Sequence, residues 1–162
     1  MKGGVQLSNF TIGILILNEN RDVFKRLIKR NNLPWDLDQI NQRWSLVETE
    51  DQFVIEEPTL KKIAEFSKEL PFLYFLDAED HEWGFTIFND GRELATFYVP
   101  HGDIVDSAIN IENISLKFKV FDISDELINK VTRIILNTNE AFENTWQQVE
   151  EFKKAIGIEE FY

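Results

Sequence analysis

Residues 71–100, PFLYFLDAEDHEWGFTIFNDGRELATFYVP, carry the clearest secondary-structure signal in this chain. Runs rich in aromatic and β-branched residues occupy 72–76, 83–88 and 94–99, and short polar segments separate them. Such runs are typical of strands, and the short connections between them favour antiparallel pairing. The sequence therefore predicts a three-stranded antiparallel meander.

The second turn of this meander has Asp90-Gly91 at its centre. A two-residue hairpin loop of this type requires positive φ angles, which glycine adopts at low cost. The turn also sets a register that begins with Asn89 opposite Arg92. The further expected pairs are Ile87 with Leu94, Phe85 with Thr96 and Trp83 with Tyr98. Because side chains alternate along a strand, Trp83, Phe85 and Ile87 are expected to share one buried face.

The rest of the chain predicts further strands and amphipathic helices. Residues 10–17 are apolar in both alternating directions, which favours a central strand. We expect helices at 21–30, just after Asp36, at 56–70, from Ser124 to Ile135 and from Phe142 to Gly157. We also expect a hairpin of 44–47 with 53–55, a loop at 102–110 and an edge strand at 114–121. Consecutive strands and an antiparallel meander predict an α+β fold, with a mostly antiparallel sheet, amphipathic helices packed against it, and a single domain over residues 1–162.

The tryptophans give a second set of expectations. Trp44 and Trp146 fall on predicted helical apolar stripes, and Trp83 lies on the apolar face of a strand, so we expect all three in the core. Of the four tryptophans, Trp35, between Pro34 and Asp36, is the best candidate for contact with a partner, although a core position is still favoured.

The composition narrows the possible classes of protein. The 162-residue chain contains no cysteine, which excludes disulfides, thiol catalysis and iron–sulfur clusters. Its longest apolar run is far shorter than the roughly 20 residues that a membrane-spanning helix needs. The first residues also lack the pattern of a secretory signal peptide. We therefore expect a cytoplasmic protein that does not bind a membrane.

The net charge of −12 is distributed unevenly. Residues 71–162 contain 7 basic and 18 acidic residues, whereas residues 1–70 are nearly neutral. Such a field opposes binding to nucleic acids and to anionic membranes, and it accelerates the encounter with a basic protein. The simpler alternative is that the acidic residues only keep the chain soluble.

One group of residues has the composition of a functional site. The loop at 77–82 and the loop after residue 99 are expected at the same end of the meander, which brings His81 and His101 together. The acidic residues around them are Asp77, Glu79, Asp80, Glu82, Asp103 and Asp106. Three interpretations remain open: solvated loops, an acidic rim that contacts a protein partner, or a metal-binding or catalytic site. Of these residues we expect the six acidic ones to contact a partner, and we expect no catalytic residue, metal or cofactor.

Residues 70–99, LPFLYFLDAEDHEWGFTIFNDGRELATFYV, resemble the centre of the SUKH superfamily. These are small bacterial relatives of a fungal cell-wall-assembly regulator, and many are immunity proteins encoded beside toxins. The shared features are the strand opening Trp83-Gly84 and the tight turn Asp90-Gly91, with flanking amphipathic helices. In place of the family's early Leu-Pro-x-x-Tyr motif the chain has Asn32-Leu33-Pro34-Trp35. The resemblance implies a binding fold without catalytic residues.

These observations favour a protein-binding domain, of immunity type, that neutralises a basic toxin. The alternatives are a small enzyme or metal-binding protein that uses the His81 and His101 end of the sheet, and a stress or cell-envelope accessory protein. The oligomeric state is left open.

Overall fold

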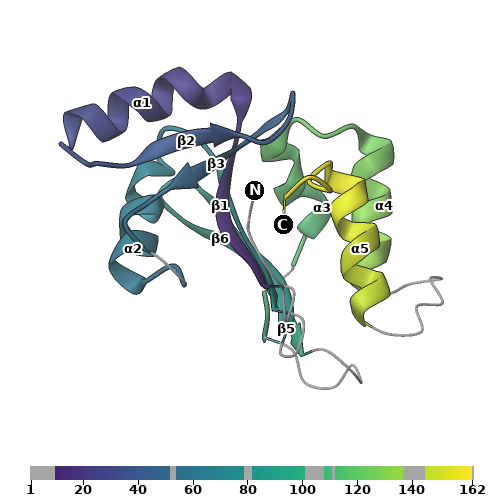
Figure 1. The fold of residues 1–162 in the computed structure, drawn as a ribbon. Coiled ribbons are helices and arrows are strands. Elements are labelled where there is room, and N and C mark those ends of the chain that lie inside the picture. Colours follow the sequence, from purple (N-terminus) through teal and green to yellow (C-terminus); the bar gives the residue numbers. More distant parts are fainter. Residues whose placement is uncertain are drawn as a thin grey trace.

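The computed structural model describes residues 10–51, 54–78, 82–100, 108–110, 112–136 and 145–161. In this part of the chain a seven-stranded antiparallel sheet lies between two groups of helices (Figure 1). The strands are β1 (Phe10–Leu17), β2 (Asp36–Gln39), β3 (Trp44–Glu48), β4 (Phe72–Ala78), β5 (Glu82–Asn89), β6 (Arg92–Pro100) and β7 (Ala108–Asn110). The helices are α1 (Arg21–Arg30), α2 (Glu57–Phe66), α3 (Ile114–Lys117), α4 (Asp125–Leu136) and α5 (Thr145–Ile156), with short 3₁₀ turns η1 (Asn18–Asn20) and η2 (Phe118–Phe121).

The strand order is β2-β3-β1-β4-β5-β6-β7, and every neighbouring pair is antiparallel. The predicted α+β fold and the meander β4-β5-β6 are confirmed. β1 lies between β3 and β4, as its two apolar faces predicted. Ile14, Leu15 and Ile16 are fully buried because helices cover both sides of the sheet at this point.

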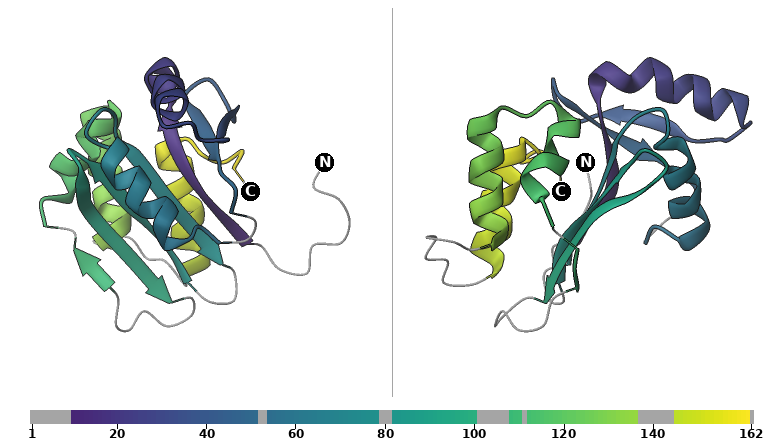
Figure 2. Two further views of the ribbon diagram at one scale, coloured as in Figure 1. Left: turned by 90° about the vertical axis from the view of Figure 1, so that its left-hand side faces the viewer. Right: turned by 180° about the vertical axis from the view of Figure 1, so that it is seen from behind.

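The sheet separates two hydrophobic cores. On one side α1 and α2 pack on the sheet, and on the other side α3, α4 and α5 do so (Figure 2). Phe152 of α5 lies at the centre of the second core, where its ring stacks on Phe85 with the centroids 5.1 Å apart. Burial of each such ring contributes about 1.5–3 kcal/mol. The two cores explain why β1, β4 and β5 need apolar residues in both alternating directions.

The Asp90-Gly91 turn has the predicted geometry, but the predicted register beyond it is wrong. Asp90 and Gly91 have φ angles of 57° and 82°, and Asn89 pairs with Arg92. A β-bulge between the pairs of Ile87 and Phe88 then places one extra residue on β6. The observed pairs are Ile87 with Ala95, Phe85 with Phe97 and Trp83 with Val99. The bulge directs these three apolar β6 residues into the core and leaves Thr96 and Tyr98 on the other face.

Residues 36–48 form a hairpin, so the predicted helix after Asp36 is wrong. β2 pairs with β3, and β3 also pairs with β1. The predicted pairing of 44–47 with 53–55 is therefore wrong as well, although residue 53 lies outside the described part. Asn41 stabilises the turn because its Oδ1 accepts hydrogen bonds from the backbone N–H groups of Arg43, at 2.8 Å, and Trp44, at 2.9 Å.

The predicted edge strand at 114–121 is also wrong, because these residues form α3 and η2. Ile114, Phe118 and Phe121 are buried, at positions i, i+4 and i+7, whereas Leu116 is 59% exposed. The helical spacing of the three large apolar residues therefore prevails over their alternation with lysines. Residues 108–110 of the predicted loop form β7, which pairs with β6.

The four longer helices form where the sequence predicted them; α1 has the predicted bounds of 21–30, and the ends of the other three differ from the predicted ones. Gly157 follows α5 with a φ of 79°, as expected of a residue that ends a helix. Trp44 and Trp83 are in the core. The prediction for Trp146 is wrong, because this side chain is 40% exposed. Trp35 is buried, at 7% exposure, and its ring meets that of Phe66 edge to face.

Candidate functional site

Two of the six acidic residues predicted to contact a partner lie in the described part of the chain. Asp77 pairs with Trp83, and Glu82 pairs with Ala78, on consecutive rungs of the β4-β5 ladder. Side chains on consecutive rungs point to opposite faces of a sheet. Asp77, only 8% exposed, therefore faces the α3–α5 side, whereas the half-buried Glu82 faces the α1–α2 side. The remaining residues of this predicted site, Glu79, Asp80, His81, His101, Asp103 and Asp106, lie outside the described residues.

The α1–α2 side of the meander presents a surface that we call the open face. It consists of Tyr74, Glu82, Thr86, Glu93, Thr96 and Tyr98. The left view of Figure 2 shows α2 crossing this side of the sheet, while β6 lies beside it without a described helix in front. Tyr74, Thr96 and Tyr98 are half-buried, which leaves part of each side chain accessible.

The ring of Tyr98 packs over Gly84, its neighbour on β5. Gly84 pairs with Tyr98, and a Cβ atom at Gly84 would overlap Tyr98 Cδ1 and the carbonyl oxygen of Phe97. The tyrosine ring therefore occupies the space that a side chain would take, an arrangement in which an aromatic ring covers a glycine in the adjacent strand. This packing fixes the direction of the phenol, whose oxygen lies 3.1 Å from Thr86 Oγ1.

The hydroxyl groups of the open face are linked. Thr86 Oγ1 lies 3.4 Å from Thr96 Oγ1, in addition to its contact with Tyr98. Burial raises the pKa of Tyr98 far above the ordinary value, and the nearby Tyr74, Glu82 and Glu93 raise it further, while the hydrogen bond with Thr86 acts in the opposite direction. Burial and the charge of Glu82 also raise the pKa of Tyr74. Both phenols therefore keep their protons at neutral pH and are suited to donating hydrogen bonds.

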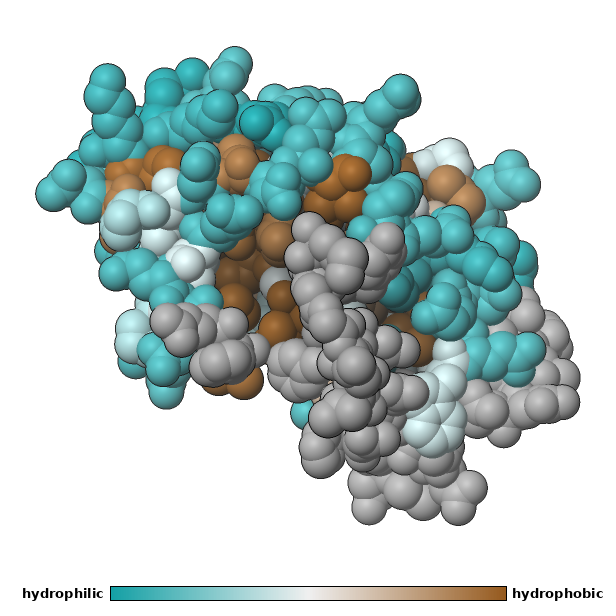
Figure 3. Space-filling model, viewed as in Figure 1, coloured by the Kyte–Doolittle hydropathy of each residue, from teal (hydrophilic) through white to brown (hydrophobic). Residues whose placement is uncertain are grey.

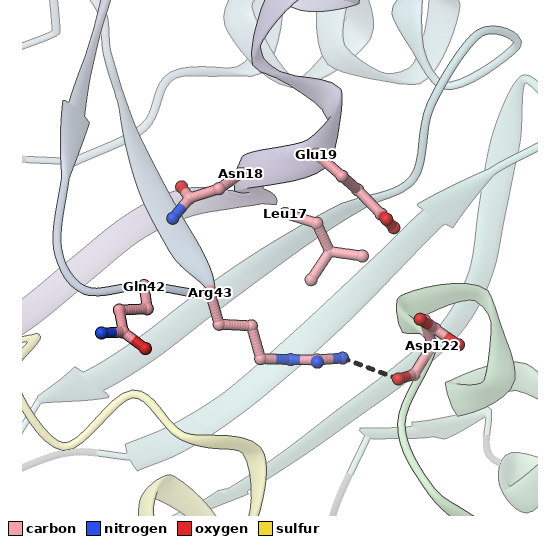
Figure 4. Close-up of a pocket in the computed structure, with 6 residues that line it drawn as sticks. All are labelled: Leu17, Asn18, Glu19, Gln42, Arg43 and Asp122. Atoms are coloured by element: carbon pink, nitrogen blue, oxygen red, sulfur yellow. Dashed lines mark hydrogen bonds between the residues drawn. The ribbon is translucent and has the colours of Figure 1, made fainter.

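A small polar pocket lies at the tip of the β2–β3 hairpin (Figure 4). It has a volume of about 240 Å³ and is lined by Leu17, Asn18, Glu19, Gln42, Arg43 and Asp122. The Arg43 guanidinium donates hydrogen bonds to the backbone carbonyls of Phe121 and, at 3.0 Å, Asp122. It also lies over the ring of Trp44, 5.9 Å from the centroid. Arg43 thus joins the hairpin to the carbonyl groups at the end of η2, which is a structural role.

Two features are absent from the described ranges, a metal-binding cluster and a membrane-spanning helix. No group of three or more His, Asp or Glu side chains in them is arranged to hold a metal ion. No described helix combines the length and the apolar character that crossing a bilayer requires. The metal-binding or catalytic alternative at His81 and His101 stays a prediction, because both histidines lie outside those ranges.

Comparison of the chain with protein-family models, curated proteins and solved structures gave no match. The tyrosines and threonines of the open face were missed at the level of sequence, although a signal for them exists. Thr96 and Tyr98 alternate with the apolar residues of β6, but only the bulged register shows that they face Thr86 and Tyr74 on one surface.

Proposed function

We propose that this chain is a non-enzymatic protein-binding domain of immunity type, which binds a basic protein partner through the open face. The observation that carries the proposal is the group of half-buried side chains on one sheet face, Tyr74, Thr96 and Tyr98, with glutamates beside them.

The chemistry of the open face suits protein recognition. Tyrosine is enriched at protein interfaces because it combines a large apolar ring with a polar tip. Tyr98 is already fixed over Gly84, so it loses little conformational freedom when a partner binds. Its protonated hydroxyl group can donate to a backbone carbonyl of the partner.

The charge of the chain supports a basic partner. Glu82 lies at one end of the open face and Glu93 near the other, and the whole chain has a net charge of −12. Such a field accelerates association with a positively charged protein and disfavours polyanions. We propose that the predicted acidic loop residues Glu79, Asp80, Asp103 and Asp106 contact the same partner.

The resemblance of residues 70–99 to the SUKH superfamily suggests the class of partner. Immunity proteins of that kind are encoded beside the toxins that they neutralise. The product of the adjoining gene is therefore the first partner to test.

The experiment measures association of that gene product with the wild-type chain and with Glu82→Lys/Glu93→Lys, at low and at high salt. The control, Glu150→Lys/Glu159→Lys, changes the net charge equally but alters exposed residues outside the open face. We expect the first variant to associate about tenfold more slowly at low salt and to show a weaker salt dependence. Equal rates for both variants would remove the open face from the interface.

A further inference from the structure

β1 extends beyond its neighbour β3 and forms a fork in the sheet. β4 pairs with β1 from Phe10 to Leu15, whereas β3 pairs only with Ile14 to Leu17. Phe10 to Gly13 therefore have a strand on one side and no described strand on the other. We call this position the β1 fork.

The backbone of Ile12 points into the fork. The N–H of Asn18 donates to the carbonyl of Arg43 over 2.8 Å, so this even-numbered residue directs its backbone groups toward β3. Backbone directions alternate along an antiparallel strand, so Ile14 and Ile12 direct theirs to the same side. Ile14 finds Val47 there, whereas the N–H and C=O of Ile12 meet no described strand.

A pocket of about 310 Å³ lies at the fork. Ile12, Val47 and Ile55 line it with apolar side chains, together with Val54, which is 53% exposed, and Leu46 adds an apolar side chain from the opposite face of β3. Figure 3 shows hydrophobic residues gathered in a hollow on this side of the molecule, below the hydrophilic surface of α1.

The other side of the fork combines the apolar Leu46 with an acidic residue, Glu48. Glu48 lines the pocket and pairs directly with Asp36 across β2 and β3, and both side chains are exposed. Like charges placed opposite each other destabilise a sheet. Ile12 and Val47 face the α1–α2 side, whereas Glu48 and Asp36 face the α5 side, because side chains alternate along the strands.

We infer that the β1 fork binds an extended segment of the partner as an added β-strand, with apolar side chains on the Ile12 side and basic side chains on the Glu48 side. This inference rests on the proposed function for the identity of the partner as a basic protein. Strand addition uses backbone hydrogen bonds for affinity and alternating pockets for specificity. The fork supplies both, since the backbone of Ile12 points into it and the carboxylate of Glu48 lies on one of its two sides.

The fork is continuous with the open face. On the α1–α2 side, Ile12 pairs with Leu76, Leu76 with Gly84, and Gly84 with Tyr98. A strand added beside Ile12 would therefore extend the surface that carries Tyr98. One partner can occupy both regions.

The direct test uses two seven-residue peptides, KVKVKVK and EVEVEVE, and measures amide hydrogen exchange by NMR. Thr11 and Gly13 direct their backbone groups toward β4, so the Ile12 amide is expected to exchange faster than theirs in the free chain. KVKVKVK should slow exchange at Ile12 by about tenfold, and EVEVEVE should leave it unchanged. Equal effects of both peptides, or no effect of KVKVKVK, would overturn the inference.

Glu48→Lys provides a variant that should not unfold. It replaces the like-charged pair with Asp36 by an oppositely charged pair, so the denaturation midpoint should stay constant or rise. The same change should weaken binding of KVKVKVK several-fold, whereas Glu150→Lys should not. Unchanged affinity of Glu48→Lys for KVKVKVK would count against the basic side of the proposed segment.

The proposed function and the fork can fail separately. Ile12→Pro removes the N–H that points into the fork, and Ile12→Val keeps it. Strand addition is supported if Ile12→Pro binds the gene product more weakly than the wild type while Ile12→Val binds it equally well. Circular dichroism must show that both variants are folded. If Ile12→Pro binds as the wild type does while Glu82→Lys/Glu93→Lys associates slowly, the open face is supported and the fork is wrong.

Discussion

The indole Nε1 of Trp44 donates a hydrogen bond of 2.8 Å to the backbone carbonyl of Ile156. This contact joins the start of β3 to the last turn of α5, 112 residues later in the chain. Asn41 adds a second link, because its Nδ2 donates to the carbonyl of Gly157 over 2.9 Å. Both bonds satisfy carbonyl groups at a helix end, where no partner exists within the helix.

Trp44→Phe should destabilise the chain by about 1–3 kcal/mol, because the buried carbonyl of Ile156 loses its donor. Chemical denaturation measures the difference. Trp146→Phe is the matched control, since that side chain is 40% exposed, and it should cost less. An equal loss in both variants would mean that the hydrogen bond contributes little.

Gly91→Val should destabilise the chain by about 1–3 kcal/mol, because a β-branched residue is forced into a positive φ of 82°. Asp90→Gly tests the neighbouring position, where φ is also positive, and should be tolerated. The measurement is the denaturation midpoint. An unchanged midpoint in Gly91→Val would show that the turn can adopt another conformation.

Tyr98→Phe should make the fold less sensitive to alkali. The folded chain holds the pKa of Tyr98 above the value of 10.0 expected for the unfolded chain. The contribution of Tyr98 to stability is then fully present below pH 10 and is lost as the pH rises from there through the folded pKa, because the unfolded state releases the proton first. Unfolding measured between pH 8 and pH 11 should show a shallower decline for Tyr98→Phe. Parallel curves would contradict the raised pKa.

His81→Ala with His101→Ala should leave the metal content and the denaturation midpoint of the purified protein unchanged, because we expect no metal site at this end of the sheet. Elemental analysis of both proteins decides the matter. A stoichiometric metal in the wild type that is lost in the double variant would favour the metal-binding alternative.

The elements with one dominant pattern were predictable from sequence. The apolar run of β1, the Asp90-Gly91 turn and the amphipathic stripe of α4 each lead to one structure. Residues 114–121 satisfy two patterns at once, because Ile114 and Phe118 share one side under both a strand and a helical period. Phe121 distinguishes the two, since it is buried with them only in a helix.

The candidate site was predictable only in part. The sequence predicted partner contacts at the acidic end of the meander, which stays a prediction, and of those residues Glu82 lies on the open face. The bulge in β6 was not predictable from the turn residues, and it alone brings Tyr98 opposite Gly84. The fork depends on where β3 ends relative to β1, and this follows from the pairing of distant strands rather than from local sequence. The sequence predicted that residues 44–47 pair with 53–55, so the fork was not expected.

The link between Trp44 and Ile156 has a consequence for synthesis on the ribosome. One face of the sheet, including Leu15 and Phe85, is covered by residues of α5 that are translated near the end of the described chain. Until those residues emerge from the exit tunnel, a nascent chain exposes this aromatic surface, which is the kind of species that aggregates. This core is therefore completed only when α5 is present, and premature stop codons before α5 should yield insoluble products.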